Sequence, residues 1–354
     1  MLNAFSNRLC KERNPRMPRQ NVTLKELADE LSLSRTTVSL ALSGKGDTYR
    51  IAPETRRRIE EAAERLGYRP NHMARSMRRG KSDTIGVVFP DVSETYMNRI
   101  LAGIESVALK EGVSLMIATS SLNAAVEARN LEMILGRRVD GMILIPYAPF
   151  RGEDYSDEAV RRAAESGVPS VAVDRYIPGV NRHAVLGADR KAARELTEKL
   201  LDSGCTRPAY LGFDLLITSL EERRRGFSDA VKTGLGAGRE FLVKSRNPGG
   251  SDMEDWLNAL ETAGEFPDGF LVSTDGLAMK LSRLLKNRFS GGRPPLIARF
   301  GEDSPYFPTG MISALQPHEK LGRRAAEMLF SLIAGEVIQK PIEILDMKIT
   351  GDNV

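Results

Sequence analysis

The chain has 354 residues, of which 41% are hydrophobic, which leaves room for a small domain beside a large buried core. Its two cysteines lie far apart and its three histidines have no neighbour at metal-ligand spacing, so we expect no disulfide framework and no metal centre. No apolar run approaches the roughly 18–20 residues of a membrane span, and the first twenty residues lack the apolar core of a signal peptide. We expect a cytoplasmic protein with no membrane partner and no cofactor.

Charge is distributed unevenly along the chain. Residues 1–82 contain 18 Lys and Arg against 9 Asp and Glu, whereas the remaining residues contain 33 against 38. A basic amino-terminal segment on an acidic body predicts contacts with nucleic-acid phosphates at one end only. Residues 1–20 are basic and show no apolar pattern, so we expect a disordered extension there.

The pattern of residues 23–42 predicts two short helices joined by a tight polar turn, the layout of a helix-turn-helix DNA reader. Thr23 and Glu26 match a capping box, and Ser34 is the expected N-cap of the second helix. An ordinary helical hairpin is the alternative for these twenty residues taken alone. The side chains expected at the DNA are Thr23, Ser34, Arg35, Thr36, Thr37, Ser39 and Leu40.

A third helix is expected over residues 53–66. Pro53 suits its first turn, and Gly67 is the expected residue at its carboxyl end. Together with the first two helices it gives a DNA-binding domain over residues 21–70. Three helices of this length make a marginal domain, which gains stability from oligomerisation or from DNA contact.

The basic segment 71–82 follows as a hinge. Met77 lies on an apolar side of a short helical pattern and could wedge into a minor-groove step, while Arg75 and Arg78 hold the DNA backbone. The run Gly-Lys-Ser at 80–82 superficially matches a phosphate-binding loop. The required upstream glycine is absent, so we reject a nucleotide site there.

From residue 84 onward, continuous apolar strands alternate with helical patterns, which is typical of a doubly wound parallel sheet. The alternation restarts at residue 189, which predicts two lobes. The fold class is therefore α/β, with a small all-α head. Ligands of such sheets bind in the crevice at the carboxyl ends of the strands. The expected strands are 84–90, 114–120, 141–146, 169–174, 208–213, 241–244, 268–273 and 295–300.

From Val22 onward the chain resembles the LacI/GalR family of bacterial transcription regulators. The matching phrases are VTLKELADELSLSRTTVSLAL, APETRRRIEEAAERLGYRPNHMARSMRRGKSDTIGVVFPDVS, RRVDGMILIP, VPSVAVDR, RRRGFSDA, FGEDSP and LQPHEKLGRRAAEMLF. Three further phrases, VLGADRKAARELTEKL, RRRGF and ARFGEDSPYF, are most similar to the fructose-repressor branch. The resemblance implies a homodimer that reads a palindromic operator in double-stranded DNA.

The resemblance also implies a periplasmic-binding-protein-like body, in which a sugar or sugar phosphate binds between the lobes. Residues 83–187 and 314–336 then form the amino-terminal lobe, and residues 188–313 and 337–354 the carboxyl-terminal lobe. Arginines can bind carboxylate or phosphate, and carboxylates can accept from sugar hydroxyls. Any one of the candidates could instead be a surface or ion-pairing side chain. The effector-binding positions carried over are Tyr96, Met97, Arg175, Arg223, Asp275, Glu302 and Asp303.

These observations favour a DNA-binding transcription regulator, acting as a repressor, under the control of a small ligand. An enzyme is disfavoured because no nucleophile elbow and no dinucleotide-binding glycine motif follows a strand. The rival from another class is a soluble sugar-binding protein whose first helices mediate protein contacts. A regulator whose pocket has lost its ligand is a further alternative.

Overall fold

The computed structural model describes residues 22–69, 80–91, 95–234, 238–244, 252–289, 292–302 and 311–351. The chain divides into two compact units, residues 1–80 and 81–354, and each is described by itself. Within the described ranges, no helix is both long and apolar enough to span a membrane. The same ranges hold no group of His, Cys, Asp and Glu side chains arranged as a metal site.

Among the described residues of the amino-terminal unit, three helices pack around one small core. Each turns an apolar face inward, because its apolar residues recur at three- and four-residue spacing. The helices are α1 (Leu24–Glu30), α2 (Arg35–Leu42) and α3 (Pro53–Leu66). The buried side chains are Leu27, Ala28, Val38, Ala41, Ile59, Ala62 and Ala63.

Local sequence decides where these helices begin and end. The backbone N of Thr23 donates to the Glu26 carboxylate at 2.7 Å, and the backbone N of Glu26 donates to the Thr23 hydroxyl at 3.2 Å. Ser34 caps α2 by accepting from the backbone N of Thr37 at 3.0 Å. Gly67 ends α3 with a φ of 66°, which glycine adopts without a steric penalty. The predicted capping box and the predicted N-cap are both confirmed.

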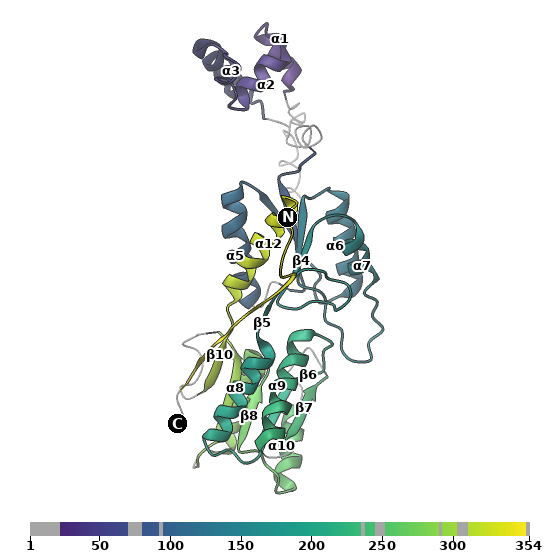
Figure 1. Cartoon of the computed structure of the whole chain (residues 1–354), viewed down its shortest axis with the longest axis vertical. Coiled ribbons are helices and arrows are strands. Elements are labelled where there is room, and N and C mark those ends of the chain that lie inside the picture. The colour runs from purple at the N-terminus through teal and green to yellow at the C-terminus, as the bar shows by residue number, and fades with distance from the viewer. Residues whose placement is uncertain are drawn as a thin grey trace, which may run out of the picture. The chain divides into compact units, whose positions relative to one another are not determined.

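The first lobe of the body has a six-stranded sheet in the order β11-β5-β4-β3-β1-β2, with every neighbouring pair parallel. Its strands are β1 (Thr84–Phe89), β2 (Ser114–Thr119), β3 (Gly141–Leu144), β4 (Ser170–Val173), β5 (Ala184–Gly187) and β11 (Ile342–Leu345). The helices on one face are α5 (Thr95–Glu111) and α12 (His318–Ile333). Those on the other face are α6 (Ala124–Gly136) and α7 (Glu158–Glu165), as Figure 1 shows.

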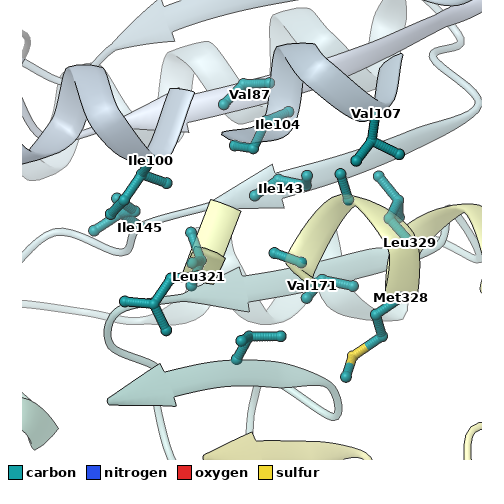
Figure 2. Close-up of a cluster of buried hydrophobic side chains, with 14 of the residues drawn as sticks. Val87, Ile100, Ile104, Val107, Ile143, Ile145, Val171, Leu321, Met328 and Leu329 are labelled. Atoms are coloured by element: carbon teal, nitrogen blue, oxygen red, sulfur yellow. The ribbon is translucent and has the colours of Figure 1, made fainter. Parts of the chain in front are cut away.

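Side-chain alternation along the strands divides the core of this lobe between the two faces. On β1, Val87 belongs to the core under α5 and α12, and its neighbour Val88 belongs to the core under α6 and α7. Figure 2 shows the first of these cores, to which Val87 of β1, Ile104 of α5 and Leu329 of α12 all belong. The central strands β1, β3 and β4 are buried on both faces, which explains why they read as continuous apolar runs.

The second lobe repeats this plan with a sheet in the order β12-β10-β9-β8-β6-β7, in which only the β10–β12 pair is antiparallel. Its strands are β6 (Pro208–Phe213), β7 (Arg239–Val243), β8 (Gly269–Val272), β9 (Leu296–Gly301), β10 (Ile312–Leu315) and β12 (Lys348–Thr350). Helices α8 (Asp189–Asp202) and α9 (Thr218–Gly234) pack on one face. Helices α10 (Asp252–Thr262) and α11 (Asp275–Arg288) pack on the other.

Near the carboxyl end, the assignment of residues to the two lobes differs from the prediction. Residues 337–354 were expected in the carboxyl-terminal lobe, but β11 pairs with β5 of the amino-terminal lobe, with Ile342 opposite Ala184. Only β12 joins the other sheet, where it pairs with β10. Residues 314 and 315 also complete β10 and so belong to the carboxyl-terminal lobe. The segment 341–350 is strand-like in the sequence, whereas the structure divides it between two sheets.

Candidate functional site

Helix α2 buries one face and leaves the other accessible. Val38 is fully buried and Ala41 is 5% exposed, so the helix is anchored from behind. A guanidinium, two hydroxyls and an apolar side chain on the opposite face can together read base edges in a major groove. The residues of that outer face are Arg35 and Thr36, which are exposed, and Ser39 and Leu40, which are partly exposed.

Of the three other DNA-contact candidates in this unit, Thr23 and Ser34 are N-caps and Thr37 is hydrogen-bonded to the cap Ser34. The Thr23 hydroxyl donates to the Glu26 carboxylate at 2.9 Å, within the capping box. The hydroxyls of Ser34 and Thr37 lie 2.9 Å apart and share a hydrogen bond, in addition to the N-cap. These side chains therefore fix the start of each helix. The hinge candidates Arg75, Met77 and Arg78 lie outside the described residues.

A cavity of about 1520 Å³ lies between the two lobes of the body. Tyr147, Tyr155 and Asp174 line it from the amino-terminal lobe, and Asp189 and Thr218 line it from the other lobe. A cavity of this size with a few polar groups can hold a ligand as large as a sugar. None of the effector candidates that the structure describes is part of the lining, but two of them lie directly behind it.

Arg223 is one of these two, and its guanidinium is bound within the protein. The side chain is 5% exposed, and its Nε donates to Asp189 Oδ1 at 2.6 Å. Its two Nη atoms donate to the carbonyl of Ser273 and to Gln316 Oε1, each at 2.5 Å. The guanidinium also lies over the ring of Phe300, 4.1 Å from the centroid. Burial raises the pKa of Asp189, while the charge of Arg223 and its hydrogen bond oppose this shift.

The spacing of the R-x-x-G-F motif at residues 223–227 positions Arg223 against Asp189. Three- and four-residue spacing places Arg223, Gly226 and Phe227 on one face of α9. A Cβ on Gly226 would collide with the backbone oxygen of Arg190, so α8 and α9 pack with their backbones in contact. Phe227 is 1% exposed and anchors this face in the core. Because Asp189 is the first residue of α8, the close packing sets it against Arg223.

A second cluster connects the ends of β8 and β9 to the other lobe. Asp275 forms an ion pair with Arg299 and accepts from the backbone N of Glu302 at 3.1 Å. Glu302 Oε1 lies 3.0 Å from His318 Nδ1, and Glu302 Oε2 lies 2.9 Å from Arg99 Nε. The hydrogen bond with His318 and the charge of Arg99 lower the pKa of Glu302, whereas burial raises that of Asp275. Since Arg99 belongs to α5 and Glu302 follows β9, the cluster joins the two lobes.

The remaining candidates differ in their placement. The ring of Tyr96 lies 5.1 Å from that of His318, so Tyr96 belongs to the cluster around Glu302. Met97 is 2% exposed and packs in the core of the amino-terminal lobe, so it is a packing residue. Consecutive residues of a helix point in directions about 100° apart, which is why Tyr96 and Met97 do not share a role. Asp303 lies outside the described residues.

Arg175 is the second candidate behind the cavity, and its neighbour Asp174 lines it. Arg175 is 7% exposed, and its Nε donates to the carbonyl of Pro146 at 2.8 Å. Asp174 is 9% exposed and has a φ of 68°, a conformation that aspartate tolerates better than most residues. Asp174 was not among the residues predicted from the sequence. Its position at the carboxyl end of a buried strand was the available signal.

Tyr147 and Tyr155 also line the cavity, and Glu127 is hydrogen-bonded to Tyr147; none of the three carried a signal in the sequence. Glu127 is 2% exposed on α6 and accepts from the backbone N of Tyr147 at 2.6 Å. Burial raises the pKa of Glu127 to about 7, although that hydrogen bond and the charge of Arg175 oppose the shift. The rings of Tyr147 and Tyr155 lie 5.5 Å apart. An acidic residue in a first helical turn is ordinary in the sequence, so only the fold shows that Glu127 is buried.

Two protein families match the chain in consecutive segments. The family described as "Bacterial regulatory proteins, lacI family" matches residues 23–71. The family described as "Periplasmic binding proteins and sugar binding domain of LacI family" matches residues 82–290. The second match covers more than half of the chain and corresponds to both lobes.

The chain is also similar to individual regulators and solved structures. The "Fructose operon regulatory protein" of Vibrio cholerae is 27% identical over 287 residues, 80% of this chain and 84% of the relative. A structure of the lac repressor dimer bound to operator and the anti-inducer ONPF has a TM-score of 0.78 at 21% identity, covering 94% of this chain and 98% of that one.

A structure of the Cra dual regulator from Pseudomonas putida, in complex with fructose 1-phosphate, has a TM-score of 0.64 at 22% identity and covers 76% of this chain and 98% of that one. At these identities the two structures show the fold, while the family matches carry the classification. The chain belongs to the LacI family of bacterial regulatory proteins: it is a DNA-binding transcription regulator with a sugar-binding domain, and not an enzyme.

Proposed function

We propose that the protein is a repressor that binds a palindromic operator as a homodimer and responds to a sugar or sugar phosphate bound between its lobes. The observation that carries this proposal is that one chain contains both a DNA-reading helix and a cavity for a ligand. A capped helix with an accessible polar face lies in a basic segment, and a cavity of about 1520 Å³ lies between two lobes of the body.

On the DNA side, α2 is the element that enters the major groove. Arg35 and Thr36 lie in its first turn, next to the N-cap Ser34, which is where recognition helices contact base edges. The hinge at 71–82 then supplies Met77 as the minor-groove wedge. Methionine is flexible, so the kink it produces is less demanding of sequence than one made by a branched side chain.

Dimerisation is needed because one head of three helices binds weakly and cannot define the spacing of half-sites. The apolar surface around the edge strand β2 supports a contact between two copies of the body. Among the described strands, β2 pairs only with β1, and its Ile117 is 47% exposed. The neighbouring helices α5 and α6 add exposed apolar side chains, among them Leu109 at 71% and Met133 at 42%.

On the ligand side, the cavity walls combine carboxylates with arginines that lie behind them. Asp174 and Asp189 can accept from sugar hydroxyls, and Arg175 can donate to a phosphate or carboxylate. The Cra structure, which shares the fold, contains fructose 1-phosphate. A ligand acts by its different affinity for two arrangements of the lobes, and the cluster around Glu302 joins the lobes in the described arrangement.

The test is to select sheared genomic DNA with the purified full-length protein at near-physiological salt and to sequence the bound fragments. Enrichment of a palindrome supports the proposal, and its affinity advantage over random DNA should persist by orders of magnitude as salt rises. A protein whose head mediates only protein contacts would lose all DNA alike as salt rises. Absence of enrichment both alone and with a mixture of sugar phosphates would contradict the proposal.

A further inference from the structure

The segment that joins α2 to α3 contains a closed helical turn. The backbone N of Tyr49 donates to the carbonyl of Lys45 at 3.2 Å, and the backbone N of Ile51 donates to the carbonyl of Gly46 at 2.8 Å. The bond from Ile51 closes the turn in the way that a Schellman motif ends a helix. Residues 45–50 are therefore a defined element, which we call the α2–α3 turn.

Arg50 occupies the position of this motif that favours glycine. Its backbone N donates to the carbonyl of Asp47 at 3.1 Å, and its φ is 53°. A residue with a Cβ is strained at this φ, whereas glycine is not. The same conformation at the end of α3 belongs to Gly67, with a φ of 66°. An arginine kept where glycine would be more stable indicates that its side chain has a function.

Arg56 of α3 fastens the turn to the rest of the amino-terminal unit. Its Nη2 lies 2.8 Å from Oδ1 of Asp47, the only acidic residue in the segment 43–52. Gly46 is buried, and a Cβ there would collide with the side chain of Arg56. The turn is thus held against α3, and the negative charge of the segment is already paired.

The side chains on the outside of the turn are cationic and aromatic. Lys45 and Arg50 are exposed, and Tyr49 is 58% exposed. Within the described part of the chain, neither Lys45 nor Arg50 has a carboxylate within 4.0 Å, whereas Arg65 at the other end of α3 pairs with Glu30 at 3.1 Å. Unpaired cations suit phosphates, and tyrosine is among the side chains that contact the DNA backbone.

The turn begins where α2 would leave the major groove. Helix α2 has eight residues and is about 12 Å long, which matches the width of a major groove, about 12 Å. With its first turn at the base edges, its other end reaches the phosphates at the border of the groove. The backbone N of Lys45 donates to the carbonyl of Leu40 at 3.1 Å, which fixes the turn to that end.

We propose that the α2–α3 turn is a second DNA-contacting element, in which Lys45 and Arg50 bind phosphates that border the major groove and Tyr49 packs against a deoxyribose. These contacts involve no base, so they strengthen binding to the operator and to other DNA alike. The inference rests on the placement of α2 in the major groove, which is part of the proposed function. It explains why a strained backbone is kept at Arg50.

The experiment measures binding of the full-length protein by fluorescence anisotropy, with the selected palindrome and with a random-sequence duplex of the same length. Both titrations are repeated between about 0.05 and 0.2 M salt. The turn variants are Arg50→Gly, Lys45→Gln and Tyr49→Ala. Arg65→Gln is the control, because it removes an exposed cation of the same unit that is already paired. Arg35→Gln tests the placement of α2 separately.

The expected pattern follows from counterion release. A dimer loses two phosphate contacts in Arg50→Gly or Lys45→Gln, so the slope of log K against log salt should fall in magnitude by about 1.8. Affinity at near-physiological salt should fall by about 30-fold for both duplexes, which leaves their ratio unchanged. Tyr49→Ala should lower both affinities a few-fold without changing the slope, and Arg65→Gln should match the wild type.

Arg50→Gly also separates function from folding. Because glycine relieves the strained backbone, its midpoint of thermal unfolding should be equal to or above that of the wild type. A lower midpoint would contradict the strain argument. Salt slopes of Arg50→Gly and Lys45→Gln equal to that of Arg65→Gln would overturn the proposal, as would a loss confined to the palindrome.

The two duplexes keep this inference separable from the proposed function. The random duplex needs no operator, so its salt slopes decide on the turn even where no palindrome is selected. If Arg35→Gln leaves binding to the palindrome unchanged, the placement of α2 is wrong and the proposal on the turn falls with it. If Arg35→Gln weakens that binding and the turn variants match the control, the turn alone is refuted.

Discussion

Replacing Glu127 by glutamine should change how stability depends on pH. The pKa of this buried carboxyl is about 7, against 4.5 for an unperturbed glutamate. At about 1.36 kcal/mol for each pKa unit, this difference corresponds to about 3 kcal/mol. Between pH 4.5 and 7 the folded state holds the Glu127 proton more tightly than the unfolded state does. The free energy of unfolding therefore falls as pH rises through this window and levels off above pH 7.

Glutamine has nearly the same shape and can still accept from the backbone N of Tyr147, but it does not titrate. Relative to the wild type, Glu127→Gln should become more stable by about 2–3 kcal/mol between pH 5 and pH 8. Urea unfolding followed by circular dichroism at several pH values measures this difference. Glu132→Gln on the same helix is the control, because Glu132 is exposed and pairs with Arg162 at 3.5 Å. A wild-type-to-variant difference that stays constant from pH 5 to pH 8 would refute the reasoning.

Three further predictions concern packing, the buried ion pair and assembly. Gly226→Ala should destabilise the body by about 1–3 kcal/mol in thermal unfolding, because its Cβ would meet the backbone of α8. Arg223→Ala should cost about 3–5 kcal/mol in urea unfolding, because it leaves Asp189 buried without a partner. Ile117→Asp should shift the protein from dimer to monomer in sedimentation experiments and weaken operator binding, because it places a charge in the apolar surface around β2.

Each of these predictions has a matched control. Gly276→Ala in α11 should be neutral or slightly stabilising, because its Cβ would meet no atom within 4 Å. Removing Asp189 together with Arg223 should recover part of the lost stability, and an additive double variant would argue against a coupled pair. Val337→Asp changes an apolar residue that is 85% exposed elsewhere, and it should leave the dimer intact. Equal dissociation by both aspartate variants would exclude β2 as the contact.

Local patterns were sufficient to predict much of the fold. Helix caps depend on neighbours in the chain, so Thr23 and Ser34 could be identified from their spacing alone. The strands predicted from long apolar runs also begin and end within a few residues of the strands in the structure. The strands β5 and β10 have four residues each, and they were not expected. The division of residues 341–350 between two sheets depends on pairing with distant strands, which no local pattern encodes.

The candidate site was predicted less completely than the fold. The resemblance named Arg223, but it could not show that Asp189 and Gln316 occupy its donors. Which groups pair with Arg223 depends on its burial, and this burial results from how α8 and α9 pack. Glu127 and Tyr155 lie on elements that gave no functional signal, yet their surroundings leave one with a raised pKa and the other without a hydrogen-bond partner among the described residues. These properties come from tertiary structure alone.

The most direct test of the account is whether a ligand in the cleft changes affinity for the operator. The selected palindrome is titrated with full-length protein, with and without a saturating sugar or sugar phosphate that binds the body. The account predicts a change of about 5- to 150-fold in operator affinity, with an equal change in ligand affinity when the operator is present. Operator affinity that stays the same while the cleft is saturated would contradict the account, because the ligand would then have no preference between the two states.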